Sequence, residues 1–300
     1  MPTLSAMPKT RTLARWTLVA TVALIALGGY TRGSGSGYGC EDRWPLCENG
    51  LLGGLLPRLD FHMIVEWTHR WVAAGIGVLI LATAISAWHY RPRSLRAFVP
   101  AVVAVAALFV EAWLGRMVVK GDLAADLVSL HLTVSVVIVG CLALVMVATE
   151  PDVPRAAGDI AWAWWLGVGA AVAYAVLLLG SLVHNLYVPG WPLVGDRLVP
   201  NLSNSDVATH WIHRLAAAAG WVYLVILALA GRRRARTERA TVLIALAAFT
   251  VTVGLGAAHV FTKVTSGGIV AAHLLFSTIV WAALVVAAAR TAGYAAAPDS

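Results

Sequence analysis

Long apolar runs separated by shorter polar segments dominate the pattern of this chain. The runs extend from about Trp16 to Tyr30, Ile64 to Trp88, Phe98 to Met117, Val128 to Ala148, Ile160 to Val183, Val207 to Ala230, Thr241 to Val260 and Gly268 to Ala289. A helix needs about 20 apolar residues to cross a bilayer, whereas barrel strands are shorter and alternate apolar with polar positions. The pattern therefore predicts an all-α membrane protein with eight transmembrane helices.

The composition supports this fold class. Apolar residues make up 60% of the 300 positions and charged residues only 12%, and the mean hydropathy is +0.79, where a soluble domain carries about 25% charged residues. These values exclude a soluble globule, a disordered chain and a small disulfide scaffold. The net charge of +7 sets topology in such a protein, so we expect a lipid bilayer and no nucleic acid as partner.

Basic residues predict the orientation of the helices. With the amino terminus inside, the inner segments hold 13 of the 22 basic residues: Lys9, Arg11, Arg15, Arg91, Arg93, Arg96, Arg155, Arg232, Arg233, Arg234, Arg236, Arg239 and Arg290. This bias favours a multi-pass protein of the cell membrane with both termini in the cytoplasm. A cleaved signal peptide is the alternative for the first run, although no small-x-small cleavage site closes that run convincingly.

Two of the three cysteines, Cys40 and Cys47, lie in the predicted first outer loop. On the oxidising side of a membrane a disulfide persists. Two interpretations stay open: a short structural staple, or a redox-active pair that exchanges thiols with a partner and is exposed for that purpose. The third, Cys141, is most simply a small apolar filler within the fourth run.

The sequence contains an internal duplication. Three motifs recur at offsets of 144, 142 and 147 residues: Trp67-Thr68-His69-Arg70 as Trp211-Ile212-His213-Arg214, His131-Leu132 as His273-Leu274, and Trp44-Pro45-Leu46 as Trp191-Pro192-Leu193. Near-constant offsets predict two homologous halves of four helices, residues 1–150 and 151–300. Because four is even, both halves enter the membrane in the same sense, as a parallel repeat.

Four histidines recur with the duplication: His69, His131, His213 and His273. They lie near the amino-terminal ends of the second, fourth, sixth and eighth runs, which share the outer level of the membrane. A single histidine on an apolar helix is most often a hydrogen-bonded core residue, but four in a repeated pattern favour ligation. Each half offers two imidazoles from two helices, which suits a haem iron better than zinc or copper, because nearby thiolates are absent.

Glu66 distinguishes the first half from the second. It precedes His69 by three residues on one helix face, and the equivalent position of the second half is His210. A carboxylate at the start of an apolar span is costly unless it is paired or used. We expect either an acid/base or proton-relay group or an ion pair with Arg70, and we expect the two halves to differ in function.

Further charged residues allow weaker predictions. Arg70 and Arg214 directly follow their histidines and are candidates to pair with haem propionates, with snorkelling to the interface as the alternative. Glu111 and Arg116 are expected to pair with each other.

Taken together, these motifs resemble the haem A synthase family (the CtaA/Cox15 type). The resemblance rests on the glycine-rich segment from Gly28 to Gly37, the loop from Cys40 to Cys47, the box Glu66-Trp67-Thr68-His69-Arg70 and the three later histidines, and it covers essentially the whole chain. It implies an eight-helix membrane oxidoreductase that oxidises the C8 methyl group of haem O to a formyl group, giving haem A for terminal oxidases.

The family resemblance also implies individual roles. His69 and His131 match the histidines that face and ligate the substrate haem O, and His213 and His273 match the ligands of a bound haem b. Glu66 matches an essential acid beside the substrate, which takes up or relays a proton while the second half passes electrons. Cys40 and Cys47 match the cysteine pair of many bacterial members. One departure is the third outer loop, Val183 to Asn204, which has Trp-Pro-Leu but no cysteines.

Such an enzyme implies several partners: haem O synthase, terminal oxidase assembly factors, an unidentified electron acceptor and a second copy of the chain. Two rival functions use the same histidines. A di-haem electron carrier of the cytochrome b561 kind would not need Glu66, and a haem transporter or chaperone would form no product. Because the Glu-x-x-His box occurs in one half only, the sequence favours the enzyme.

Overall fold

The computed structural model describes residues 6–90, 95–150, 159–183, 187–195, 197–263 and 265–294. Eight long helices account for most of them: α1 (Ala6–Gly33), α3 (Phe61–Tyr90), α4 (Leu95–Lys120), α5 (Ala125–Ala148), α6 (Ile160–Val183), α7 (Ser205–Ala230), α8 (Arg236–Phe261) and α9 (Gly267–Thr291). Three short helices join them: η1 (Ser36–Tyr38), α2 (Leu51–Gly54) and η2 (Gly231–Arg233). The described residues contain no β-strand, so the predicted all-α class is confirmed.

All eight long helices are long and apolar enough to cross a membrane, as predicted. The helix α6 coincides with its predicted range, whereas α1 begins ten residues and α8 five residues before the predicted apolar runs. Lys and Arg have good helix propensity, so a helix continues into a charged segment that hydropathy assigns to a loop. Hydropathy therefore located the membrane-embedded part of each helix rather than its end.

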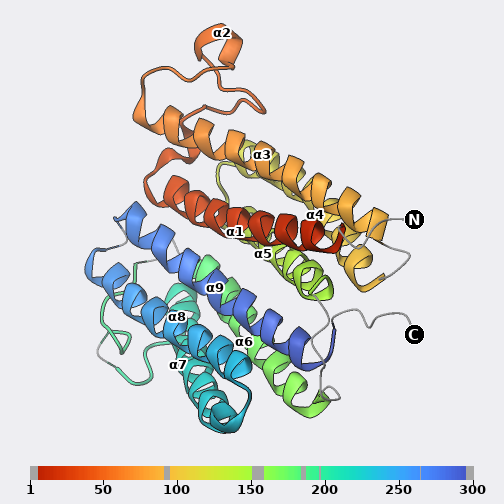
Figure 1. The fold of residues 1–300 in the computed structure, drawn as a ribbon. Helices are drawn as coiled ribbons and strands as arrows, with labels where there is room; N and C mark the ends of the chain where they lie inside the picture. Colours follow the sequence, from red (N-terminus) through yellow and green to blue (C-terminus); the bar gives the residue numbers. More distant parts are fainter. Residues whose placement is uncertain are drawn as a thin grey trace.

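The helices pack in two groups of four (Figure 1). In the first group α1 contacts α3 and α5, and α4 contacts α3 and α5; in the second, α6 contacts α7 and α9, and α8 contacts α7 and α9. The groups meet where α1 packs on α9 and where α5 packs on α9 and α6. The start of α1 and the end of α9 lie at the same end of the bundle. The duplication and its boundary at residue 150 stay predictions.

A buried ion cluster ties the groups together at this end. Glu150 follows α5 and accepts hydrogen bonds from Arg290 of α9 at 2.6 Å and from Arg11 of α1 at 3.3 Å. The Glu150 side chain is only 8% exposed. A buried carboxylate needs such partners, because an unpaired charge in this position would be strongly destabilising.

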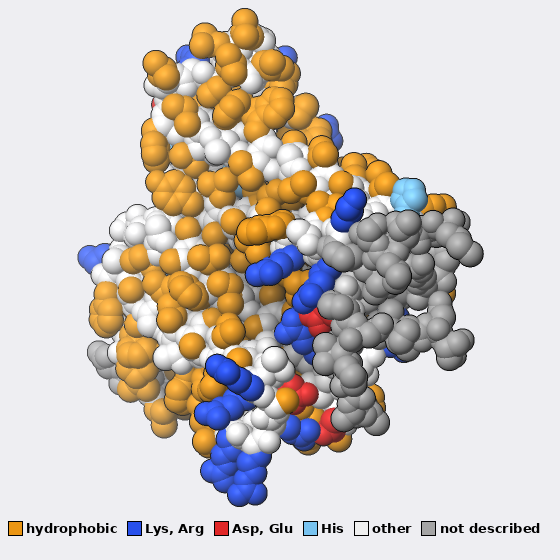
Figure 2. Space-filling model, viewed as in Figure 1, with side chains coloured by type: hydrophobic (Ala, Val, Ile, Leu, Met, Phe, Trp, Pro, Cys, Tyr) orange, Lys and Arg blue, Asp and Glu red, His pale blue; other side chains and the backbone are white. Residues whose placement is uncertain are grey.

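The surface of the molecule agrees with a membrane setting (Figure 2). Apolar side chains cover most of the face shown, and blue Lys and Arg side chains gather near the end of the bundle that holds the start of α1 and the end of α9. Arg91, Arg93 and Arg155, on which the predicted orientation also depends, lie outside the described residues.

The contact between α1 and α9 depends on glycine. A Cβ atom placed on Gly29 would lie 2.6 Å from Leu274, and one on Gly33 would lie 2.9 Å from the Cα atom of Gly267. Small residues at such positions let helix backbones approach closely, which is how transmembrane helices gain packing energy in lipid. The glycine-rich segment thus joins the two groups of helices.

We predict that Gly33→Ala destabilises the bundle by about 1–3 kcal/mol, the usual cost of overpacking, because the backbone of α9 cannot yield as a flexible side chain would. Thermal unfolding in detergent measures the effect. The matched control is Gly75→Ala, since a Cβ atom there would meet no atom within 4 Å. Equal melting temperatures for the two variants would show that the close approach of α1 and α9 is not required.

Candidate functional site

A large cavity of about 1170 Å³ lies between the helices and is lined mostly by apolar side chains from both groups of four. All four repeated histidines line it, together with Glu66 and the two arginines that follow His69 and His213. The two Trp-Pro-Leu segments line it as well, so the loop between α1 and α3 and the loop between α6 and α7 contribute to its walls.

Each histidine occupies an equivalent place in its helix. His69 and His213 are the ninth residues of α3 and α7, and His131 and His273 are the seventh residues of α5 and α9. The prediction that the four lie near the amino-terminal ends of their helices is confirmed. All four side chains are partly buried, and the helix positions place them at a common level of the bundle.

Each imidazole rests on a glycine of a neighbouring helix. A Cβ atom on Gly28, Gly115, Gly180 or Gly256 would lie 3.2, 3.3, 3.0 or 3.4 Å from the Cε1 atom of His69, His131, His213 or His273, respectively. The four contacts join α1 to α3, α4 to α5, α6 to α7 and α8 to α9. The glycines thus provide the space that the rings fill, and packing fixes where each ring stands.

Hydrogen bonding does not explain His69 as an ordinary core histidine. The Nδ1 atom of His69 is buried, and among the described residues it makes no hydrogen bond of ordinary geometry. Buried polar atoms normally have such a partner. An imidazole that is fixed by packing and left unsatisfied in an apolar cavity is suited to binding a ligand.

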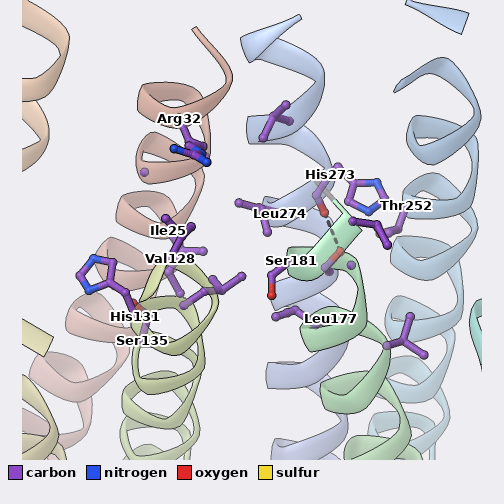
Figure 3. Close-up of a pocket in the computed structure, with 18 of the residues that line it drawn as sticks. Ile25, Arg32, Val128, His131, Ser135, Leu177, Ser181, Thr252, His273 and Leu274 are labelled. Atoms are coloured by element: carbon purple, nitrogen blue, oxygen red, sulfur yellow. Dashed lines mark hydrogen bonds between the residues drawn. The ribbon is translucent and has the colours of Figure 1, made fainter. Parts of the chain in front are cut away.

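The close-up view shows how the two groups present their rings (Figure 3). His131 projects from α5 and His273 from α9, and in this view the two imidazoles point to opposite sides, with Ile25 and Leu274 between them. The two rings therefore do not face each other in this view.

Glu66 takes part in a dense polar cluster beside His69. Its side chain is 4% exposed, it pairs with Arg70, and it accepts a hydrogen bond of 2.8 Å from the backbone N–H of Cys40. The ion pair expected between Glu66 and Arg70 is therefore present. The carboxylate still lines the cavity, so pairing does not remove it from the site.

The arginines of the two repeated boxes hold the loop between α1 and α3 and the loop between α6 and α7. Arg70 donates to the carbonyl groups of Arg43 and Pro45 at 2.8 and 3.1 Å. Arg214 donates to three loop carbonyls, those of Gly190, Leu193 and Val188 at 2.6, 2.9 and 3.1 Å. Each guanidinium thus fixes a Trp-Pro-Leu segment at the wall of the cavity.

The tryptophans of the same boxes repeat this pattern. Trp67 Nε1 donates to the carbonyl of Leu55, and Trp211 Nε1 donates to the carbonyl of Leu198, both at 2.9 Å. In each Trp-x-His-Arg box the histidine therefore lines the cavity, while the tryptophan and the arginine bind the loop that forms part of the cavity wall. This explains physically why the three residue types occur together.

The expected disulfide between Cys40 and Cys47 is present, but the expected exposure is wrong. The two cysteines are 0% and 1% exposed and pack against Met63 and Trp67. Thiol exchange requires access to a sulfur atom, so the structure favours the staple. The sequence placed the pair in a loop, and it could not show that the loop folds back over its own cysteines.

The loop between α1 and α3 is also fastened to the end of α4. Lys120 donates a hydrogen bond of 2.9 Å to Asp42, and this bond and the lysine charge hold the pKa of the Asp42 carboxyl below its usual range. Tyr38 of η1 donates to Asp122, and this hydrogen bond raises the pKa of Tyr38. The two contacts keep the loop over the first group of helices.

The predicted pairing of Glu111 with Arg116 is wrong. Glu111 accepts a hydrogen bond from Ser135 of α5, and its Oε1 atom lies 3.3 Å from His131 Nδ1. A separation of five residues turns two side chains to different sides of a helix, which the sequence analysis overlooked. Glu111 lines the cavity, and the sequence did not indicate that it belongs to the site.

The fold and the site define a multi-pass membrane protein in which a helix bundle presents paired imidazoles to one apolar cavity. Residues 55–286 match the COX15-CtaA family, described as cytochrome oxidase assembly protein. This match covers more than half of the 300 residues, and the chain belongs to that family.

Several relatives bear the name Heme A synthase. The protein from Symbiobacterium thermophilum is 32% identical over 236 residues, which are 73% of this chain and 74% of that protein. The protein from Alkalihalophilus pseudofirmus is 25% identical over 283 residues, or 89% and 92% of the two chains. The one from Listeria monocytogenes is 25% identical over 280 residues, or 89% and 90%.

We predict that Arg214→Gln loosens the loop between α6 and α7. Hydrogen bonds from a charged donor contribute about 1.5–3 kcal/mol each, so amide hydrogen exchange at Gly195, whose N–H bonds to Pro189 at 3.0 Å, should speed up by roughly 10-fold or more. The control is Arg197→Gln, at an exposed position of the same loop. Unchanged exchange in Arg214→Gln would mean that the guanidinium does not hold the loop.

Proposed function

We propose that this protein is a haem A synthase, an oxidoreductase that oxidises the C8 methyl group of haem O to a formyl group and so supplies haem A to terminal oxidases. Membership of the COX15-CtaA family and the relatives named Heme A synthase support the proposal. The observation that carries it is the cavity lined by four equivalent histidines, each seated on a glycine.

The site fits haem in its donor set and its surroundings. Two neutral imidazoles from two helices are a common pair of axial ligands, and an apolar slot in a helix bundle suits a macrocycle. In this proposal His213 and His273 hold a resident haem b in the second half, residues 151–300, and His69 and His131 hold the substrate haem O in the first half, residues 1–150.

The assignment of substrate to the first half depends on polar groups around the two pairs. Glu66 stands beside His69, whereas His210 occupies the equivalent position of the second half and is 8% exposed. A resident electron-transfer haem needs no acid at its edge, whereas oxidation of a methyl group removes protons as well as electrons. The half that carries the carboxylate is therefore the half in which we place the chemistry.

Bound haem supplies the electron-transfer chemistry of the site. The chain itself positions the methyl group and handles its protons. Glu66 is the carboxylate that takes up a proton released from the substrate, and Arg70 and the Cys40 N–H orient it for this. Positioned acids and bases contribute typically 10²–10⁴-fold to a rate.

Arg70 and Arg214 are the proposed partners of the haem propionates. A guanidinium has five N–H donors, and the loop and Glu66 contacts described above use three of them in each residue. Both arginines line the cavity, so the other N–H groups are near enough to the site to bind a carboxylate.

In the cell we place both termini in the cytoplasm and the haem sites towards the outer face of the membrane. This orientation follows the excess of basic residues at one end of the bundle and puts the Cys40–Cys47 disulfide on the oxidising side. Haem O synthase, terminal oxidase assembly factors, an electron acceptor of unknown identity and a second copy of the chain are the proposed partners.

The proposal is tested by extracting and chromatographing the pigments of the purified protein after co-expression with a haem O source. We expect haem A or a hydroxylated intermediate, together with haem b. His69→Ala should abolish the oxidised product and His213→Ala should deplete haem b. His89→Ala is the matched control, because His89 is exposed at the other end of α3. Haem b alone in both halves would indicate an electron carrier instead.

A second variant tests the role of Glu66. Glu66→Gln keeps an oxygen that accepts from Cys40 but cannot take up a proton, so we expect at least about a 100-fold slower conversion of haem O with the haem content unchanged. Glu41→Gln, on the exposed part of the first outer loop, should convert haem O normally. Full conversion by Glu66→Gln with normal haem content would refute the proton-transfer role.

A further inference from the structure

Glu111 forms a three-residue cluster with the histidine of α5. Ser135 Oγ donates to Glu111 Oε1, and the same oxygen lies 3.3 Å from His131 Nδ1, although the ring N–H does not point directly at it. Glu111 is 15% exposed and its second oxygen, Oε2, is buried with no hydrogen-bond partner among the described residues. The carboxylate thus stands beside the histidine inside the bundle.

The second half has the same frame without the carboxylate. Gly115 and Gly256 make the same contact with His131 and His273, and this register places Thr252 at the position of Glu111. Thr252 Oγ1 donates to the backbone carbonyl of Ala248 on its own helix, at 2.9 Å.

The serines show the consequence of this difference. Ser135 of the first half donates across to Glu111. Its counterpart Ser277 donates to the backbone carbonyl of His273 on its own helix, at 2.7 Å. The described residues therefore place a carboxyl oxygen beside the α5 histidine, whereas the equivalent position of α8 is a threonine.

We propose that Glu111 is a positioning residue that accepts the Nδ1 proton of His131, so that Nε2 of this ring is the atom offered to the ligand. The proposal deepens the proposed function and rests on it, because the ligand is the substrate haem in the first half. A carboxylate behind a ligating histidine fixes the tautomer and the ring orientation and makes the imidazole a stronger electron donor.

The pairing has a direct consequence for the two sites. A stronger donor stabilises the oxidised iron, so the carboxylate sets the reduction potential of the first-half haem below the value that neutral surroundings would give. The second half has Thr252 in place of the carboxylate. The two halves then differ in redox character through one side chain at equivalent positions.

The test is a spectroscopic redox titration of the full-length protein, purified after co-expression with a haem O source. The first-half component is identified by its loss in His131→Ala. Glu111→Gln should raise its midpoint potential and weaken haem binding in that half by roughly 10- to 100-fold. Ser135→Ala should lower the same potential, because an oxygen that no longer accepts from Ser135 accepts more strongly from His131.

Opposite shifts from two neighbouring substitutions are not expected from mere loss of packing. Ser277→Ala is the matched control in the second half, where the serine bonds only to backbone, and neither potential should move. The role of Glu111 would be overturned if two haem components were present and neither midpoint potential changed in Glu111→Gln or Ser135→Ala. It would also be overturned if both substitutions shifted the first-half potential in the same direction. A wild-type protein with a haem component in the second half alone would instead overturn the proposed substrate site, and this assignment with it.

Discussion

The contact on which the site depends is an imidazole ring packed against a glycine of the next helix. It occurs four times, and in each case a side chain as small as alanine would place its Cβ atom 3.0 to 3.4 Å from the ring carbon. The contact brings two helices close in a bilayer, where small residues drive packing, and it fixes where a polar ring stands in an apolar cavity. The remaining parts of the site are arranged around these rings.

Around this repeated frame the two halves carry different polar groups. The first half has Glu66 and Glu111 beside its histidines, and the second half has His210 and Thr252 at the corresponding positions. The frame therefore accounts for what the halves share, namely imidazoles held at equivalent places. The carboxylates account for what they do not share, and they are the reason for placing a reaction in one half and a resident cofactor in the other.

Much of this arrangement was predictable from the sequence. Hydropathy located all eight membrane-spanning helices, because burial in lipid leaves a long apolar run that few other structures produce. The four histidines were predictable because they recur at fixed offsets. The partners of Glu111 were not, because a contact between α4 and α5 depends on the rotation of each helix about its axis. The burial of Cys40 and Cys47 was missed for a related reason, because an irregular loop has no repeating pattern of apolar and polar residues from which burial can be predicted.

The central claim is that each half presents its own histidine pair to its own haem. An experimental density map of the purified protein loaded with haem tests this claim most directly. We predict two separate macrocycles per chain, with the iron of one between His69 and His131 and the iron of the other between His213 and His273. A single haem ligated by one histidine from each half, or irons bound by none of these four residues, would contradict the account.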